Sequence, residues 1–255
     1  MYQLETIYQQ IIKAISKSEK LLAVLIDPDK MTIKMASQFI GKINQSLATH
    51  IFVGGSTVAD FATEQLVSVI KKNTHLPIIL FPGDVSQITG QADALLFLSL
   101  ISGRNPEYLI GKQVASVSKL RQMHLEVIPT GYLLIENGKE TAVQKVTGTE
   151  PMSKDSVQDI VDTAKAGELL GMKLIYLEAG SGALNPIDST IINNVKKEIS
   201  LPLIVGGGIR TKKQLEEAYN SGADLVVIGT AFEDNEALFE ELASLSSRHL
   251  PKGEN

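Results

Sequence analysis

Three consecutive glycines, Gly206–Gly208, constrain the fold of this chain more than any other feature of its sequence. They follow the apolar run Leu203–Val205, and Thr211 then opens a helical pattern. Glycines inside a strand cost backbone entropy and pack against nothing, so such a run indicates a sharp turn with exposed backbone N–H groups. The same arrangement recurs one helix later, where Gly229 follows the apolar run Leu225–Ile228.

Two successive strand–glycine–helix units are typical of a (β/α)8 barrel, which holds phosphate groups in the loops after its seventh and eighth strands. Ordinary tight turns are the alternative for either unit alone. The rest of the chain favours the barrel, because helical patterns separate most of its short apolar segments. The eight expected strands begin near residues 21, 50, 77, 94, 125, 173, 203 and 224.

Two of the intervals between these strands are irregular. Residues 83–93 are too few for a full-length helix, so the third helix is expected to be short or missing. Residues 131–155 form a long connection, rich in Gly, Thr and Lys from Asn137 on, which indicates an ordered loop or a lid over the site.

The fold class predicted is therefore α/β: a single, modified (β/α)8 TIM barrel domain over residues 1–255, with an extra amphipathic helix before the first strand. The strand near 125 is expected to end at Pro129, and Ser246–Asn255 are expected to form a tail. Further helices are expected from about residue 32 and at 57–73, 106–123, 156–170, 188–198 and 235–246.

The composition excludes several classes of function. The 255 residues contain no cysteine, which rules out disulfides, thiolate metal sites and a cysteine nucleophile. With 24 Lys and Arg against 29 Asp and Glu, the net charge of −5 argues against nucleic acid as a general partner. No uncharged apolar run reaches the ~18 residues of a membrane span, and residues 1–20 lack the apolar core of a signal peptide. A cytoplasmic location is expected.

Polar residues gather where the expected strands end, which is the active-site face of a (β/α)8 barrel. Asp27 and Asp29 follow the first strand, Ser56 and Thr57 follow the second, and Glu178 ends the sixth. Carboxylate and hydroxyl oxygens suit Mg²⁺, whereas the bare amides of the glycine loops suit a phosphate dianion. A site with both features indicates two phosphorylated substrates.

Helix capping is the alternative for the early polar residues, because Asp and Ser are favoured at helix starts. It applies to the acidic pair Asp27 and Asp29 and to Ser56 or Thr57, each of which precedes an expected helix.

Glu178 suits packing poorly, since it ends a buried strand and is followed by small residues; we predict that it transfers a proton. The histidines at 50, 75, 124 and 249 lie away from the predicted rim, so neither a histidine base nor a histidine metal site is expected. Tyr132 is interpreted as a core residue.

Six motifs follow one another along the chain. They are Leu25–Lys30 (LIDPDK), Gly54–Ser56, Phe81–Gly83, Tyr176–Gly182 (YLEAGSG), Val205–Arg210 (VGGGIR) and Gly229-Thr230. In kind and order they resemble the geranylgeranylglyceryl phosphate synthase family, from about residue 20 to 245. The YLEAGSG block together with DPDK is specific, whereas GGG alone occurs in many phosphate-binding barrels. Some members of the family have Gly-Asn where this chain has Gly229-Thr230. Both pairs offer the same backbone amides to a phosphate.

The resemblance implies an Mg²⁺-dependent prenyltransferase that joins a prenyl diphosphate, first of all geranylgeranyl diphosphate, to sn-glycerol 1-phosphate as an ether and releases diphosphate. It implies Mg²⁺ at Asp27 and Ser56. The residues that it places around glycerol phosphate are Tyr176, Leu177, Glu178, Ala179, Gly180, Ser181, Gly182, Gly207, Gly208, Gly229 and Thr230. We further expect a homo-oligomer and a transient contact with a membrane surface to deliver the lipid product.

Two other functions fit the phosphate loops. A phosphosugar isomerase, cyclase or aldolase would share them, but a Schiff-base aldolase needs a lysine on a late strand, and only Lys173 lies there, at the entry end. A non-catalytic barrel that binds a phosphometabolite would have little use for Glu178 beside the acidic residue Asp27.

Overall fold

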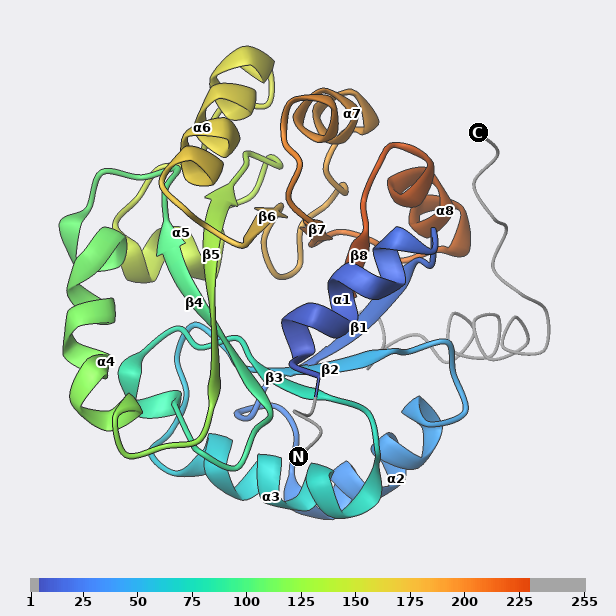
Figure 1. Ribbon diagram of the computed structural model, residues 1–255, viewed down its shortest axis with the longest axis vertical. Helices are drawn as coiled ribbons and strands as arrows, with labels where there is room; N and C mark the ends of the chain where they lie inside the picture. The colour runs from blue at the N-terminus through green and yellow to red at the C-terminus, as the bar shows by residue number, and fades with distance from the viewer. Residues whose placement is uncertain (1–4, 230–255) are drawn as a thin grey trace.

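The structure is a computed structural model that describes residues 5–229 (Figure 1). Eight parallel strands form a closed barrel in chain order, and the last pairs with the first. The strands are β1 Leu21–Ile26, β2 His50–Val53, β3 Ile78–Leu80, β4 Ala94–Leu100, β5 Glu126–Leu134, β6 Leu174–Glu178, β7 Leu203–Gly206 and β8 Leu225–Ile228. The predicted TIM barrel is confirmed. The predicted helix 235–246 and the tail after it lie outside the described residues.

Helices surround the barrel and mostly alternate with its strands (Figure 1). Local capping fixes several of their starts: α1 and α8 begin with capping boxes, in which Thr6 pairs with Gln9 and Thr211 with Gln214. The helices are α1 Ile7–Ser16, α2 Ile33–Ile43, α3 Ala62–Asn73, α4 Lys112–Leu120, α5 Ala142–Thr147, α6 Val157–Leu169, α7 Ser189–Glu198 and α8 Lys212–Asn220.

The strands are mostly apolar because both of their faces are buried. Alternate side chains fill the barrel interior, including Ala23, Phe52 and Ile204. Their neighbours point outward and pack beneath the helices, as Val24 and Val205 do. This alternation explains why a run such as Leu21–Ile26 shows no polar residue.

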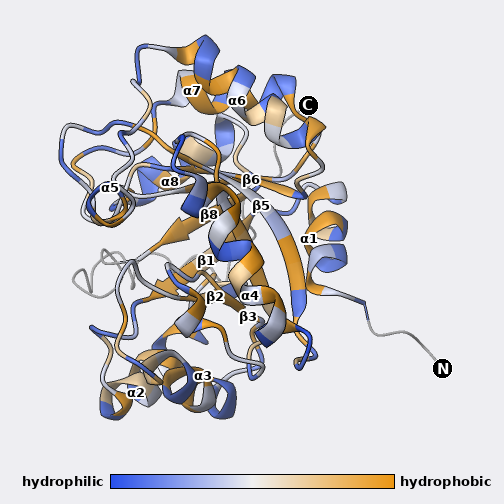
Figure 2. Cartoon of the chain, turned by 90° about the vertical axis from the view of Figure 1, so that its left-hand side faces the viewer, coloured by the Kyte–Doolittle hydropathy of each residue, from blue (hydrophilic) through white to orange (hydrophobic). Residues whose placement is uncertain are grey.

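α1 lies across the amino-terminal ends of the strands. The N–H groups of Ile7 and Tyr8 donate to the carboxylate of Glu126, the first residue of β5, at 2.6 and 3.1 Å. Ile11 packs into the interior cluster and is only 2% exposed. Figure 2 shows α1 and α5 at opposite ends of the barrel, so the extra N-terminal helix covers the end away from the active-site face.

The helix between the third and fourth strands, predicted to be short or missing, is indeed missing from the described chain. Between β3 and β4 the chain makes only the 3₁₀ turn η1, Val85–Gln87. Its N-cap is Asp84, whose carboxylate accepts from Ser86 N at 3.0 Å.

Several predicted boundaries were wrong. β5 continues past Pro129 to Leu134, because Thr130–Leu134 pair with both β4 and β6. The segment 131–155 therefore starts as strand and also contains α5. The helix expected at 57–73 begins only at Ala62. The helix expected at 106–123 starts as the π-helical turn η2, Glu107–Gly111, before α4.

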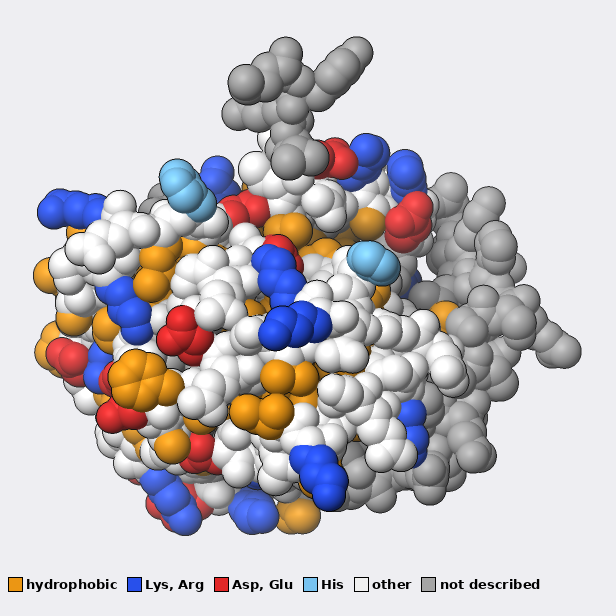
Figure 3. Space-filling view, turned by 90° about the horizontal axis from the view of Figure 1, so that it is seen from below, with side chains coloured by type: hydrophobic (Ala, Val, Ile, Leu, Met, Phe, Trp, Pro, Cys, Tyr) orange, Lys and Arg blue, Asp and Glu red, His pale blue; other side chains and the backbone are white. Residues whose placement is uncertain are grey.

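The surface that carries α2 and α3 mixes charged, polar and apolar side chains. In Figure 3 the apolar side chains of that face form small groups between basic and acidic ones. No helix in residues 5–229 has the length and apolar character needed to cross a membrane.

Candidate active site

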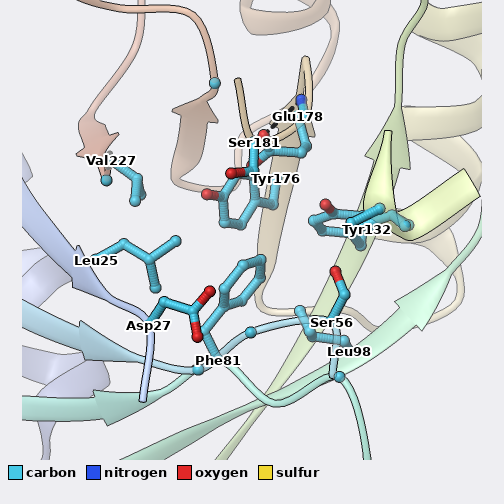
Figure 4. Close-up of a pocket in the computed structure, with 18 of the residues that line it drawn as sticks. Leu25, Asp27, Ser56, Phe81, Leu98, Tyr132, Tyr176, Glu178, Ser181 and Val227 are labelled. Atoms are coloured by element: carbon cyan, nitrogen blue, oxygen red, sulfur yellow. Dashed lines mark hydrogen bonds between the residues drawn. The ribbon is translucent and has the colours of Figure 1, made fainter. Parts of the chain in front are cut away.

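A cavity of about 670 Å³ opens at the carboxyl ends of the strands. Three groups of side chains form its wall, as Figure 4 shows. Glu178 and Ser181 lie on one side, Asp27 and Ser56 lie on the other, and aromatic rings lie between them. Five further residues of the wall carry mainly apolar side chains: Leu98, Leu100, Tyr108, Val143 and Val146.

Glycines form the edge of the cavity that belongs to β6 and β7. Gly180, Gly207 and Gly208 have φ values of +100°, +84° and +73°, in the region that side chains disfavour. Space excludes side chains as well, because a Cβ on Gly207 would lie 2.6 Å from Glu178 Oε1 and 2.8 Å from Gly180 N. A Cβ on Gly208 would clash with the backbone of Asn185. The two loops are thus packed directly on each other, with backbone amides at the cavity wall.

Arg210 ties these loops together from outside the turn. Its guanidinium group donates to the carbonyl oxygens of Ala183 and Leu184 at 2.6 and 3.1 Å. The loop after β7 therefore fixes the position of the loop after β6.

Glu178 is the buried acid of this site. It ends β6, is 6% exposed, and its Oε1 accepts from Gly180 N at 2.6 Å. Burial raises the pKa of Glu178 to about 7, although the Gly180 N–H and the Tyr176 hydroxyl oppose the shift. A carboxyl group with this pKa exchanges a proton readily near neutral pH.

Three aromatic rings form the wall between the two edges. Phe81 stacks on Tyr176 with ring centroids 5.2 Å apart, and Tyr132 meets both rings at 5.8 and 5.3 Å. The Tyr176 hydroxyl is buried and lies close enough to Glu178 to lower the pKa of that carboxyl group, but it is not oriented for a full hydrogen bond with any described residue. Tyr132 is 5% exposed and lines the cavity, so its interpretation as a core residue alone was incomplete.

Asp27 and Ser56 line the opposite edge. Asp27 Oδ1 accepts from Asp29 N at 3.1 Å, and Lys30 Nζ lies 3.7 Å from its Oδ2. The carboxylate points into the cavity in Figure 4. A Cβ on Gly55 would lie 2.8 Å from Asp27 Oδ1, so a side chain there would require the Asp27 carboxylate to move.

Gln87 holds the loops after β2 and β3 in place. Its Nε2 donates to Gly55 O at 2.8 Å, and its Oε1 accepts from Gly83 N at 3.2 Å. Gly83 lies so close to Ser56 that a Cβ would be 2.9 Å from the Ser56 carbonyl oxygen. The turn η1, which replaces a full helix, therefore shapes this edge of the cavity.

Helix capping, the alternative for the early polar residues, was wrong. The N-cap of α2 is Thr32, and the N-cap of α3 is Phe61, which makes no side-chain cap bond. Asp29 instead accepts from Ala59 N at 3.0 Å. Asp27 and Ser56 are thus free of a capping role.

Most of the predicted site residues meet at this cavity. Leu177 and Ala179 do not: both are fully buried in the layer beneath the helices, and Ala179 N already donates to Gly206 O at 3.0 Å. Thr230 lies outside the described residues. Those that line the cavity are Asp27, Ser56, Tyr176, Glu178, Gly180, Ser181, Gly182, Gly207, Gly208 and Gly229.

No described histidine lines the cavity, and residues 5–229 contain no group of three or more His, Asp or Glu side chains that could hold a metal ion. The sequence prediction missed several residues of the wall. Tyr132 was hidden by the underestimated length of β5, and only the structure brings Lys112 and Gln113 of α4 to the cavity.

Comparison with known proteins agrees with this geometry. The model of the PcrB family matches residues 13–245. The chain belongs to the PcrB family. A relative from Flavobacterium johnsoniae, named geranylgeranylglyceryl phosphate synthase, is 53% identical over 93% of this chain and 98% of its own length. A relative of the same name from Pyrococcus furiosus is 41% identical over 85% of this chain and 86% of its own length.

A solved structure extends the likeness to the whole barrel. The (S)-3-O-geranylgeranylglyceryl phosphate synthase of Thermoplasma acidophilum, in complex with its substrate sn-glycerol-1-phosphate, superimposes with a TM-score of 0.87. It is 32% identical and covers 95% of this chain and 97% of its own. This member of the PcrB family is thus an enzyme of the geranylgeranylglyceryl phosphate synthase type.

Proposed function

We propose that this enzyme joins a long-chain prenyl diphosphate to sn-glycerol 1-phosphate through an ether bond and releases diphosphate. One observation carries the proposal: a buried acid with a raised pKa, Glu178, lies in a cavity whose wall also contains glycine loops and apolar side chains. The apolar side chains suit a prenyl chain, and the backbone amides of the glycine loops suit a phosphate dianion. Geranylgeranyl diphosphate is the expected donor, as the names of the relatives suggest.

The glycine edge orients the acceptor. Backbone amides at Gly207, Gly208 and Gly229 bind the phosphate of glycerol phosphate, and the phosphate then fixes its free hydroxyl next to Glu178. Ser181 and Gly182 complete this edge. Because the amides are held by close packing, binding requires little rearrangement of the loops.

Glu178 accepts the proton of that hydroxyl. The glycerol oxygen forms a bond to C1 of the prenyl chain, the bond from C1 to the diphosphate oxygen breaks, and diphosphate leaves with the electron pair. A carboxylate is a weak base for a free alcohol, but the hydroxyl proton becomes acidic once the oxygen bonds to a cation-like allylic carbon. The rings of Phe81, Tyr132 and Tyr176 offer their π-electrons to that carbon.

Asp27 and Ser56 fit Mg²⁺. They supply one carboxylate and one hydroxyl, which suits an ion that keeps several waters and takes further oxygens from a substrate phosphate. The Asp27 carboxylate accepts a backbone hydrogen bond from Asp29 N and faces the cavity, which leaves oxygen lone pairs for an ion (Figure 4). Asp27 and Ser56 would hold Mg²⁺ where its charge would neutralise the departing diphosphate.

The phosphosugar isomerase or cyclase that the sequence left open would use the same glycine edge. The apolar side chains of the cavity wall favour the prenyltransferase, because a phosphosugar has no apolar chain to contact them. The homo-oligomer and the membrane-surface contact stay predictions.

The decisive experiment is an assay for product mass with prenyl diphosphates of several lengths and each enantiomer of glycerol phosphate. An ether product with the sn-1 enantiomer alone is expected. Equal use of both enantiomers, or turnover of a phosphosugar without ether formation, would contradict the proposal.

A further inference from the structure

Three basic side chains of the described residues line the cavity: Lys30, Lys112 and Arg210. Arg210 is engaged by carbonyl oxygens at the glycine edge. Lys30 lies 3.7 Å from Asp27 Oδ2, where a bound divalent cation would repel its ammonium group. Lys112 is the basic side chain whose position depends neither on the glycine edge nor on a metal bound at Asp27.

Lys112 is held at the cavity by its own set of partners. Its ammonium group forms a short ion pair with Asp84, lies 3.8 Å from Glu107 Oε1, and sits 5.8 Å from the centroid of the Tyr108 ring. The Asp84 hydrogen bond raises the pKa of Lys112, so the side chain stays charged. The side chain remains 30% exposed, which leaves it within reach of a ligand.

Asp84 in turn belongs to the edge that carries Ser56. It directly follows Gly83, whose backbone packs on Ser56. Gln87 binds Gly55 and Gly83 and so fixes both loops. A continuous chain of contacts therefore runs from the Ser56 loop through Gly83 and Asp84 to Lys112.

The start of α4 is fixed from the other side as well. Gln113 is 8% exposed, and its Nε2 donates to the carbonyl oxygen of Leu98 in β4. The π-helical turn η2 precedes Lys112 and ends there, and such turns often occur at functional sites. The backbone of Lys112 is therefore held against the barrel while its side chain faces the cavity.

We propose that Lys112 binds the diphosphate group of the prenyl substrate, with Asp84 holding the ammonium group in position; the inference rests on the proposed function. A diphosphate with about three negative charges exceeds the charge of one divalent ion, and lysine is a common point-charge ligand of phosphate. In this assignment the Lys112 ammonium group stabilises the departing diphosphate.

The test measures binding of inorganic diphosphate with Mg²⁺ to the full chain by calorimetry, alongside KM for each substrate. Lys112→Gln should weaken diphosphate binding and raise KM for the prenyl diphosphate by about tenfold or more, as loss of a charged hydrogen bond predicts. KM for glycerol phosphate should stay within twofold, roughly the scatter of uncoupled sites. Lys112→Arg should retain most of the binding.

Lys119→Gln is the matched control, because Lys119 lies on the same helix and, within residues 5–229, bonds only to the carbonyl oxygens of Val85 and Ser86, outside the cavity. It should leave both affinities unchanged. Asp84→Asn, which keeps Lys112, should weaken diphosphate binding less than Lys112→Gln does.

Unchanged diphosphate affinity in a folded Lys112→Gln protein would overturn the assignment, as would an equal loss of glycerol phosphate affinity. If the wild type binds diphosphate through Lys112 but forms no ether, the proposed function fails while the binding role of Lys112 stands.

Discussion

The two edges of the cavity are built in different ways. The edge after β6 and β7 consists of backbone: Gly207 and Gly208 have positive φ and leave no space for a side chain. The opposite edge presents side chains: Asp27 after β1, Ser56 after β2 and Lys112 at the start of α4. Asp27 accepts a hydrogen bond from Asp29 N, and Lys112 forms an ion pair with Asp84. A backbone site gives a fixed shape, whereas a side-chain site can adapt its charge to a metal and a leaving group.

This contrast also separates what each edge does in the proposed reaction. The glycine edge fixes the position of the acceptor, so substitutions there should change how glycerol phosphate is oriented. The polar edge, which carries Asp27, Ser56 and Lys112, balances charge, so substitutions there should change the use of metal and diphosphate. Glu178 lies on the glycine edge and is the one residue of that edge that transfers a proton in the proposed reaction.

Glu178→Gln should have the largest effect. Loss of the proton acceptor should lower kcat by roughly 10²–10⁴-fold, with KM for glycerol phosphate nearly unchanged, because the amides remain. Steady-state kinetics of ether formation measures both. A near-normal kcat would remove Glu178 from the proton transfer and with it the distinction drawn between the edges.

The same variant should gain stability at neutral pH. Burial raises the pKa of Glu178 from 4.5 to about 7, so between these values the folded state binds more protons than the unfolded state and stability falls as pH rises. The full loss, above pH 7, is on the order of 3 kcal/mol. Urea unfolding at pH 5 and pH 8 should show that decline in the wild type beyond that in Glu178→Gln. Parallel declines in both proteins would contradict a buried, titrating carboxyl group.

Gly208→Ala should weaken glycerol phosphate binding by roughly 10–100-fold, the expected cost of misplacing a charge-assisted hydrogen bond. The new Cβ would clash with the backbone of Asn185, and the alanine would have to adopt an unfavourable φ of +73°. Gly171→Ala is the control, since Gly171 has φ +92° but open space around it. That control should lose roughly 1–2 kcal/mol of stability and leave KM unchanged. If both variants bind normally, the backbone does not define the acceptor site.

Asp27→Asn should act on the other edge. The half-saturating Mg²⁺ concentration and KM for the prenyl diphosphate should each rise by about tenfold, or about 1.4 kcal/mol, because a carboxylate charge is lost from the metal's surroundings. Binding of glycerol phosphate should not change. Kinetics at varied Mg²⁺ provides the measurement, and an unaltered Mg²⁺ dependence would contradict the metal assignment.

Tyr176→Phe should have the smallest effect. The Tyr176 hydroxyl lowers the pKa of Glu178, so its removal should raise that pKa and move the acidic limb of the kcat/KM profile, which lies near pH 7, to higher pH. At pH values well above the limb the rate should approach that of the wild type. A limb that moves to lower pH would show that the hydroxyl acts differently.

The two edges also differ in how far the sequence predicts them. The glycine edge could be predicted because only glycine tolerates the backbone angles and contacts found at Gly207 and Gly208. The barrel itself followed from apolar runs that the two buried faces of each strand require.

The polar edge and the aromatic wall depend on contacts distant in sequence. Tyr132 reaches the cavity because pairing with β4 and β6 extends β5 beyond Pro129, where local signals indicate a loop. Lys112 meets a counterion, Asp84, that lies 28 positions earlier in the chain. Neither the extension of β5 nor the Lys112–Asp84 ion pair produces a local sequence pattern. The sequence therefore predicts Asp27 and Ser56 as site residues but not the side chains that surround them.

The position of α1 has a kinetic consequence. In the described part of the chain this helix covers the amino-terminal end of the barrel, so traffic of reactants and products is confined to the opposite mouth. In the proposed reaction the lipid product therefore leaves through the mouth by which its prenyl donor enters, and it must leave before the next donor binds. Turnover should therefore be limited by departure of the lipid and should accelerate when detergent or vesicles remove it.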